Sequence, residues 1–147
     1  MLYVRLTLYT DYSLRVLLYL GAKERQELST IQEIADAYTI SKNHLMKVTH
    51  QLGQLGLVET IRGRGGGIRL AQSPDAINIG AVVRQTEEDF HLVECFDVEN
   101  NLCRLSSHCR LKGVLYEALQ AYLAVLDRYT LADCLHNEQD LLALLRS

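Results

Sequence analysis

The chain has 147 residues, of which 48% are hydrophobic and 22% charged, and its formal net charge is -3. This length fits one compact domain, and the hydrophobic content is enough for a buried core, which argues against a disordered protein. The first residues carry too many polar side chains for a signal peptide, and no stretch reaches the length of a membrane span. We therefore expect a cytoplasmic protein with no membrane partner.

The charge is distributed unevenly along the chain. Residues 1–40 carry a net charge of -1, residues 41–69 carry +4, and residues 70–147 carry -6. The basic segment contains one acidic residue, Glu59, and the cations Lys42, Lys47, Arg62, Arg64 and Arg69. Because salt screens charges beyond about 10 Å, phosphates respond mainly to local charge. An acidic protein with such a segment can therefore bind nucleic acid.

Apolar residues between Leu14 and Leu18 predict a first helix that runs toward Gly21. We expect Thr10 or Asp11 to cap it, because short polar side chains satisfy the first unpaired amides of a helix. A polar linker, residues 23–27, follows.

Two short helices come next, in close succession. Thr30 and Glu33 have the spacing of a capping box before an amphipathic helix that ends near residue 40. Ser41 caps a second helix, whose inward-facing residues we expect to be Leu45, Val48 and Leu52. Two helices joined this tightly form a helix-turn-helix.

A hairpin is predicted after these helices, with strands at residues 57–61 and 68–70. Its tip, residues 62–67, reads RGRGGG, and glycines let such a tip approach a phosphate backbone or enter a narrow minor groove. An ordinary turn and a nucleotide-binding loop are the alternatives. The second is disfavoured because Ile68 occupies the last glycine position of G-x-G-x-x-G. The preceding helix-turn-helix favours a DNA-binding wing.

The side chains that we expect to contact DNA lie on the second helix of the helix-turn-helix and on the wing. Asn43 and His44 fall in the first helical turn, where such helices touch base edges, and lysines suit phosphates. A solvated helix face is the alternative, which the wing and the local charge of +4 disfavour. The candidate set is Ser41, Lys42, Asn43, His44, Lys47, Arg62, Arg64, Gly65 and Gly66.

Three more helices are predicted in the second half of the chain. Asn78 caps a short one, and Thr130 with Asp133 caps a last one that ends in several leucines. Between them, Ser106 or Ser107 caps a long helix with a broader apolar face than a small winged helix needs. We interpret the surplus as a homodimer interface, with intramolecular packing as the alternative. A two-fold dimer would bind a palindromic operator in double-stranded DNA.

Three of the four cysteines, Cys95, Cys103 and Cys109, share a polar loop with the spacing C-x7-C-x5-C. In a reducing cytoplasm they are better ligand candidates than disulfide partners. The spacing lacks the paired C-x2-C of most structural zinc sites, which favours an iron-sulfur cluster and leaves zinc as the competitor. We expect Cys109 near the N-terminus of the long helix, where amides and the helix dipole stabilise an anionic cluster.

The remaining ligand position and the fourth cysteine are less determined. Cys134 lies in an apolar segment, and we expect it to be part of the core. Three thiolates leave one position for a fourth ligand, for which the loop itself offers His108, Glu94, Asp97 and Glu99.

The predicted fold class is mainly α with a small β-hairpin wing (α+β), a winged helix-turn-helix plus a long dimerisation helix. We expect residues 1–86 to form the DNA-binding domain, residues 87–110 the cluster-binding loop, and residues 106–147 the dimerisation helix and the C-terminal helix. A regulator with zinc or no metal in the loop, responding to another signal, is the main alternative function. A redox enzyme is least favoured, because there is no C-x-x-C pair, nucleophile elbow or dinucleotide loop.

Several motifs together resemble the NsrR group of bacterial repressors, which sense nitric oxide and belong to a winged-helix regulator family that also contains IscR. The resemblance covers nearly the whole chain. It rests on residues 6–15 (LTLYTDYSLR), 41–45 (SKNHL), 62–67 (RGRGGG), 78–84 (NIGAVVR), 93–97 (VECFD) and the three-cysteine loop.

The resemblance implies a homodimer with one 4Fe-4S cluster per chain, ligated by Cys95, Cys103 and Cys109, and a 2Fe-2S cluster is the alternative. It implies repression of nitric-oxide detoxification and nitrosative-stress genes, relieved when the cluster is nitrosylated. It nominates Asp11, donated by the partner chain, as the fourth ligand, although Asp11 can instead act at a helix N-terminus and pair with Arg15. IscR-like proteins have a histidine three residues after the last cysteine, where this chain has Lys112, which counts against an IscR-type 2Fe-2S centre.

Overall fold

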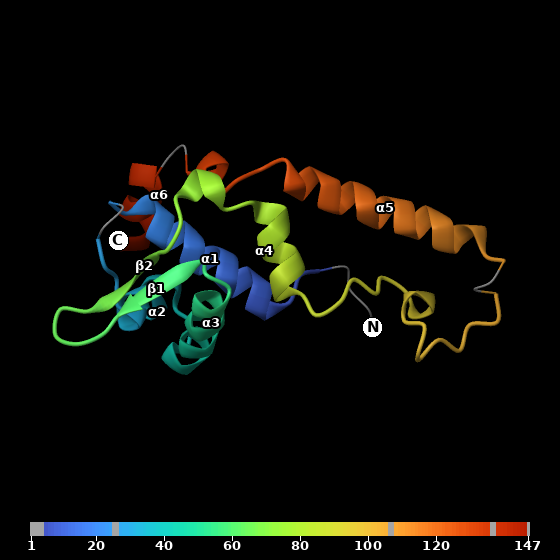
Figure 1. The fold of residues 1–147 in the computed structure, drawn as a ribbon, viewed down its shortest axis with the longest axis horizontal. Coiled ribbons are helices and arrows are strands. Elements are labelled where there is room, and N and C mark those ends of the chain that lie inside the picture. The colour runs from blue at the N-terminus through green and yellow to red at the C-terminus, as the bar shows by residue number, and fades with distance from the viewer. Residues whose placement is uncertain (1–4, 25–26, 106–107, 136–137, 147) are drawn as a thin grey trace.

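The computed structural model describes residues 5–24, 27–105, 108–135 and 138–146. It is mainly α-helical with one antiparallel hairpin, as predicted, and α5 extends as an arm from a compact body (Figure 1). The elements of the described chain are α1 (Leu8–Ala22), α2 (Ile31–Tyr38), α3 (Lys42–Gln54), β1 (Val58–Ile61), β2 (Gly67–Leu70), α4 (Ile79–Thr86), α5 (Arg110–Asp127) and α6 (Glu138–Arg146), with short 3-10 turns at Pro74–Ala76, Glu94–Phe96 and Ala132–Cys134.

The first helix begins one turn earlier than predicted. Its cap is Thr7, whose hydroxyl accepts a hydrogen bond from the Thr10 N–H at 3.3 Å, so the expected cap at Thr10 or Asp11 was wrong. Thr10 is fully buried within the first turn, where its hydroxyl lies 2.9 Å from Thr86 Oγ1 and also contacts the Glu87 carboxylate. The sequence has several side chains near this position that can cap a helix. The one used, Thr7, also contacts a distant residue, Glu87.

The helix-turn-helix has the predicted caps. The Thr30 hydroxyl accepts from the Glu33 N–H at 3.0 Å and opens α2, and the Ser41 hydroxyl accepts from the His44 N–H at 3.4 Å and opens α3. Thr39, with φ of 56°, makes the turn between the helices. The expected inward residues are all at most 1% exposed, namely Leu45, Val48 and Leu52. Local sequence signals were sufficient for this motif.

Glycines determine the shape of the hairpin. Gly56, with φ of 77°, ends the turn after α3, and β1 pairs with β2 in a register that places Ile61 opposite Gly67. A Cβ at Gly66 would lie 2.1 Å from the Ile61 carbonyl oxygen, so a larger residue cannot occupy this position without a shift of the backbone. Ser29 adds one antiparallel bridge to β2 and attaches the hairpin to the body.

The C-terminal end of α5 is joined to α4. Asn78 caps α4 as predicted, by accepting from the Ala81 N–H at 2.9 Å, and its side-chain amide donates to the Asp127 carbonyl at 2.7 Å. The Asp127 carboxylate pairs with Arg84 at 2.6 Å. Cys109 is the residue that precedes the first turn of α5, whereas the expected caps Ser106 and Ser107 lie outside the described residues.

The expected last helix is divided in two. Thr130 and Asp133 form the predicted reciprocal bonds, at 2.8 and 3.4 Å, but they open a single 3-10 turn, and α6 is a separate helix that packs on α1 and α2. Cys134 is exposed rather than in the core, so that expectation was wrong. Leu131 and Leu135, on either side of this turn, are buried, and Cys134 lies on the outside.

The predicted polar linker contains a buried cation. Lys23 is 8% exposed, and its ammonium pairs with Glu33 and, at 3.7 Å, with Glu27. The Tyr19 hydroxyl donates to the same Glu33 carboxylate at 2.5 Å. Burial acts to raise the pKa of Glu33, but the hydrogen bonds from Lys23 and Tyr19 outweigh it and lower the pKa. This charge network joins the end of α1 to the start of α2.

Candidate functional site

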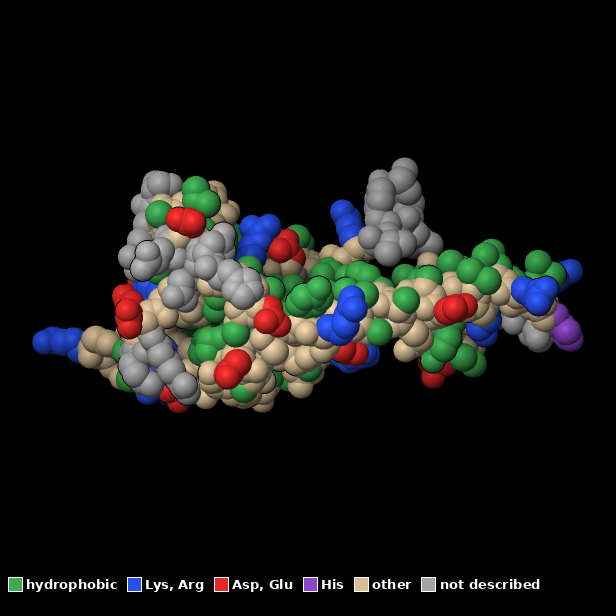
Figure 2. Space-filling view, turned by 90° about the horizontal axis from the view of Figure 1, so that it is seen from above, with side chains coloured by type: hydrophobic (Ala, Val, Ile, Leu, Met, Phe, Trp, Pro, Cys, Tyr) green, Lys and Arg blue, Asp and Glu red, His purple; other side chains and the backbone are tan. Residues whose placement is uncertain are grey.

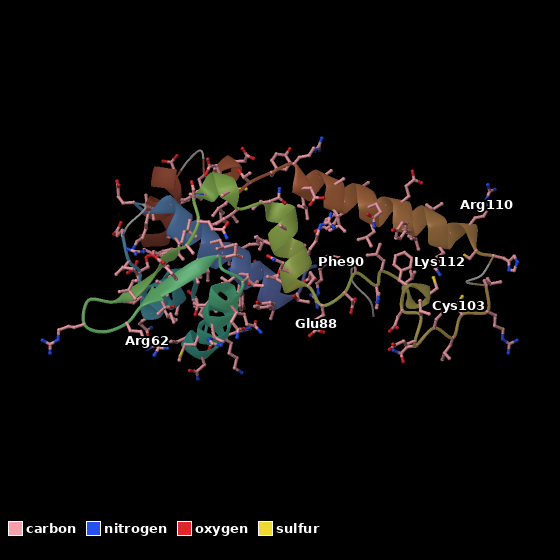
Figure 3. All side chains as sticks on the ribbon, in the orientation of Figure 1. Arg62, Glu88, Phe90, Cys103, Arg110 and Lys112 are labelled. Carbon is pink, nitrogen blue, oxygen red and sulfur yellow. The ribbon has the colours of Figure 1, made fainter. Side chains whose placement is uncertain are left out.

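The candidate DNA-contacting residues and the three loop cysteines lie at opposite ends of the molecule. Figure 3 shows Arg62 on the hairpin and Cys103 and Lys112 at the far end of the arm. Helix α3 and the hairpin belong to the body, on the side away from α5 (Figure 1). Within one chain, any effect of the loop cysteines on the hairpin or α3 must therefore pass through the structure between them.

Helix α3 presents most of its candidate residues to solvent. Ser41, Lys42, Asn43 and Lys47 are exposed. His44 is half-buried, and its ring meets the ring of Tyr12 edge to face with centroids 4.8 Å apart. His44 therefore connects α3 with α1 in addition to lying in the first turn of α3.

The hairpin tip carries two exposed cations on a backbone that requires glycine. Arg62 and Arg64 are exposed, and Gly63 and Gly65 have φ of 98° and 76°. These positive dihedral angles favour glycine because they strain residues with a Cβ. The third cation, Arg69, pairs with Glu59 on the facing strand, so its charge is partly compensated. Uncompensated positive charge is concentrated at the tip.

Two of the three loop cysteines line one cavity, of about 480 Å³. Cys95, in the turn Glu94–Phe96, is 8% exposed, and Cys109 is half-buried at the start of α5. Aromatic rings form much of the wall, and Phe96 meets Tyr116 of α5 edge to face with centroids 6.3 Å apart. Lys112 lies on the same wall. The cavity combines soft sulfur donors with an apolar enclosure.

Cys103 is exposed and lies outside the residues that line this cavity. In the part of the chain that the structure describes, no three Cys, His, Asp or Glu side chains come together as a metal-binding group. Donors of the right kind for an iron-sulfur cluster are therefore present, and two of them share a cavity. Bringing all three together requires a change in the cysteine loop, residues 87–109.

The carboxylate of Asp97 organises the turn that follows Cys95. Its oxygens accept from the backbone N–H groups of Glu99 and Asn100, at 3.2 and 3.3 Å, and from the Asn100 side-chain amide at 2.9 Å. The Asn100 hydrogen bond is the main cause of a lowered pKa at Asp97. Asp97 thus serves the loop backbone. Of the other fourth-ligand candidates, Glu99 is exposed, and the side chain of Glu94 lies outside the description.

Asp11 has the intrahelical partner that its sequence position suggested. Its carboxylate receives a two-pronged contact from Arg15, with Oδ1 2.9 Å from Nε and Oδ2 3.2 Å from Nη2. Both side chains are about two-fifths exposed. The Arg15 guanidinium also lies 5.8 Å from the ring centroids of Tyr12 and Tyr38. Asp11 can reach solvent while it is held in the first turn of α1.

Helix α5 has an apolar stripe that no described part of the chain covers. Leu119 and Leu123 are buried on the side that faces the body. Figure 2 shows hydrophobic side chains along the arm. The exposed residues recur every three or four positions, as one face of a helix does, and are Leu111, Val114, Ala118, Tyr122 and Val125.

Two features of this region were absent from the sequence-based expectations. One is the aromatic wall of the cavity, since aromatic residues in a polar loop carry no local signal of enclosure. The other is a set of hydrogen bonds between Thr7, Thr10 and Glu87. The pair of threonines three positions apart was visible in the sequence, but its distant partner was not.

Comparison with known proteins adds a family to this geometry. The chain matches the Rrf2 family, described as an iron-dependent transcriptional regulator, over residues 6–137. It is 64% identical to the HTH-type transcriptional regulator NsrR of Bacillus subtilis over 97% of this chain and 98% of that protein.

Solved structures agree with this result. CymR, the global cysteine regulator of B. subtilis, superposes with a TM-score of 0.73 at 27% identity, covering 90% of this chain and 96% of that one. IscR of T. potens shares the fold, with a TM-score of 0.71 at 24% identity, and the superposition covers 90% of this chain and 86% of that one.

None of the helices described here is long and apolar enough to cross a membrane. The family consists of transcriptional regulators, so the chain is a DNA-binding protein and not an enzyme. The similarity to a known regulator over nearly the whole chain, the family match and the winged-helix fold all agree. The chain therefore belongs to the Rrf2 family of transcriptional regulators.

Proposed function

We propose that this regulator is a homodimeric, cytoplasmic repressor that senses nitric oxide through an iron-sulfur cluster and controls nitric-oxide detoxification genes. The observation that carries the proposal is the pairing of a winged helix with a loop whose Cys95 and Cys109 line one cavity. The similarity to NsrR and the iron dependence ascribed to the family support the same chemistry.

The DNA-binding part of the proposal rests on charge and exposure. Asn43 lies exposed in the first turn of α3, where a side chain can reach base edges in the major groove. Lys42 and Lys47 flank it for phosphate contacts, and Arg62 and Arg64 can enter the minor groove. Gly65 and Gly66 keep the tip thin enough for close approach. The target is double-stranded DNA with a palindromic operator.

The thiol groups of Cys95, Cys103 and Cys109 are proposed to hold the cluster, which is 4Fe-4S in preference to 2Fe-2S. An iron-sulfur centre bound there would supply iron that reacts with nitric oxide. Cys109 precedes the first turn of α5, where free amides favour the negative charge of a thiolate. The aromatic rings of Phe90, Phe96 and Tyr116 give this cavity a largely apolar lining.

The partner's Asp11 is proposed as the fourth ligand, and the geometry supports this in one respect. Its carboxylate is on the surface, held by Arg15 at 2.9 Å, and could exchange that partner for another without unfolding α1. An oxygen donor is a poor match for a soft metal site and would be the most easily displaced of the four.

A homodimer is proposed because the exposed stripe of α5 has the spacing of a helix-pairing surface. Leu111, Val114 and Val125 are 60, 58 and 44% exposed in the single chain. A second copy of α5 would cover them and place two α3 helices for half-sites about 34–36 Å apart or at multiples of that distance.

The first experiment is an anaerobic purification followed by assays of iron and sulfide and by a visible absorption titration with nitric oxide. We expect a coloured, sulfide-containing protein whose absorption changes at a few nitric-oxide equivalents per cluster. Cys103→Ser should lose iron and colour, and Cys134→Ser, which changes an exposed cysteine away from the loop, should keep both. A colourless wild type that cannot be reconstituted would instead indicate a zinc-bound or metal-free regulator.

A further inference from the structure

Four polar side chains connect the first turn of α1 to the point where the chain leaves α4. This Glu87 group comprises Thr7, Thr10, Thr86 and Glu87. The Thr7 N–H lies 3.2 Å from each carboxylate oxygen of Glu87, and the Thr7 hydroxyl donates to Oε2 at 2.5 Å. The Thr10 hydroxyl contacts the same oxygen and lies 2.9 Å from Thr86 Oγ1. The connection spans eighty residues of sequence.

The group is anchored at one end in the core. Thr10 and Thr86 are 0% and 4% exposed, and the Thr86 hydroxyl also donates to the Val82 carbonyl at 2.9 Å. Hydrogen bonds to an ionised carboxylate are stronger than neutral ones, and burial strengthens them further. The carboxylate also lies at the N-terminus of α1, where the helix dipole favours negative charge. The start of α1 is therefore fixed relative to the end of α4.

The two connected elements lead to different regions of the protein. Helix α1 packs on α3, and Tyr12 of α1 touches His44 in the first turn of α3. In the other direction, Glu87 is the residue at which α4 ends and the cysteine loop begins. Figure 3 shows Glu88 and Phe90 in the first part of the cysteine loop, directly after α4, and Phe90 lines the same cavity as Cys95.

We propose that Glu87 is a positioning residue, which transmits the arrangement of the cysteine loop to α1, and through α1 to α3, within one chain. A change at the start of the loop moves the carboxylate, and the amide and two hydroxyls of α1 that bind it move with it. This rests on the proposed function, because it requires the loop to differ between the iron-loaded and iron-free protein. It adds an intramolecular connection to the ligand proposed from the partner chain.

The test compares Glu87→Gln, which keeps the size and removes the charge, with Glu88→Gln, which removes the same charge from an exposed neighbour. The probe is a DNA duplex selected from a random library by the iron-loaded wild type. Dissociation constants are measured for the iron-loaded and iron-free forms of each protein. The quantity compared is the ratio of the iron-free to the iron-loaded dissociation constant for DNA. We expect Glu87→Gln to lower this ratio by at least about fivefold, the lower end of typical couplings between sites. Glu88→Gln should keep the wild-type ratio.

Iron and sulfide content are measured in parallel, because the inference requires Glu87→Gln to load iron as the wild type does. Thr7→Val, which removes one hydroxyl donor and leaves the carboxylate, should lower the ratio in the same direction. Hydrogen exchange at the amides of Thr7 and Asp11 gives a second readout. Their protection should differ between iron-loaded and iron-free wild type, and this difference should shrink in Glu87→Gln.

The outcomes separate this inference from the proposed function. If Glu87→Gln weakens DNA binding equally in both forms, Glu87 has only a structural role, and the inference is overturned. The same holds if the ratio is unchanged while the wild type loads iron and responds to nitric oxide. A wild type that takes up no iron contradicts both the inference and the proposed function.

Discussion

The body of this protein and its arm, residues 87–127, differ in what covers their apolar side chains. In the body, residues from α1, α2, α3, the hairpin and α6 surround a common core, with Val16, Ile34 and Leu45 fully buried. Along the arm, Val98 and Leu102 are 86% and 85% exposed, and one face of α5 is uncovered. The body can therefore be stabilised by its own contacts, whereas the arm has surface that calls for contact with another molecule.

The same contrast holds for the polar groups. In the body, helix caps and the Lys23 network have their partners within the chain. In the arm, Cys95 and Cys109 line a cavity with aromatic rings in its wall, and Cys103 is exposed outside that lining. These polar groups of the body are thus satisfied within the chain, and the proposed cluster and the proposed dimer surface both lie in the arm.

The largest effect should come from a cavity in the body. Leu52→Ala removes a side chain that is 0% exposed, and we expect a loss of about 2–5 kcal/mol in the free energy of unfolding. Val125→Ala on the arm, at 44% exposure, should change it by roughly 0.5 kcal/mol or less. Urea denaturation at concentrations where the chain is monomeric measures both. Equal losses would mean that α5 is part of the same core.

A charge on the exposed stripe should come next. Val114→Lys places an ammonium in the proposed homodimer interface, and we expect about 2 kcal/mol, or roughly a thirtyfold rise in the dimer dissociation constant. Gln120→Lys adds the same charge about 200° around the helix from the middle of the stripe, by helical periodicity. Sedimentation velocity over a concentration series distinguishes them. If both variants remain dimeric, the two chains meet elsewhere.

A smaller effect is expected from one cation of the hairpin tip. Arg64→Ala should weaken DNA binding and lower the slope of log affinity against log salt by about 0.9, because one positive charge that neutralises the phosphate backbone from within the groove is lost. Arg128→Ala, at the end of α5, removes the same charge from the arm and should leave the slope unchanged. Binding of a selected duplex at several salt concentrations gives the slope. An equal change in both variants would indicate long-range charge and no wing contact.

The smallest effect concerns alkaline pH. Burial raises the pKa of Tyr38 to about 12 from 10.0, against the opposing charge of Arg15. The fold favours the neutral phenol, so its stabilising effect is complete below pH 10 and is lost as pH rises from 10 to 12. Tyr38→Phe should reduce this loss of stability between pH 10 and 12, although it also removes the hydrogen bond to the Arg15 carbonyl. Tyr122→Phe, on the arm, should follow the wild type in thermal unfolding between pH 9 and 12.

Local signals predicted much of the body. The caps at Thr30, Ser41 and Asn78 depend on atoms within three residues, and the sequence predicts each of them correctly. The first helix was misjudged at its start, because Thr7 is bound by Glu87, eighty residues away. Capping chemistry is local, but which of the neighbouring capping residues is used depends here on a distant carboxylate.

The cysteine region was predicted in its chemistry and only partly in its geometry. The spacing of Cys95, Cys103 and Cys109 indicated thiolate ligands, and no local pattern could indicate that Cys95 and Cys109 share a cavity. Cys134 was expected in the core because its neighbours are apolar. In the structure Leu131 and Leu135, which flank a single 3-10 turn, are buried, whereas Cys134 within that turn is exposed, and the local sequence does not show which of these side chains meets the body.

By itself, the sequence determined the helix-turn-helix, the glycine-dependent hairpin, the basic segment and the set of available thiols, because each depends on residue types at short spacing. The tertiary structure decided which side chains share surroundings. It joined α1 to the start of the cysteine loop through Glu87, buried Lys23 beside Glu33, and left one face of α5 exposed. These features depend on contacts between residues far apart in the chain, which form only when the elements pack together.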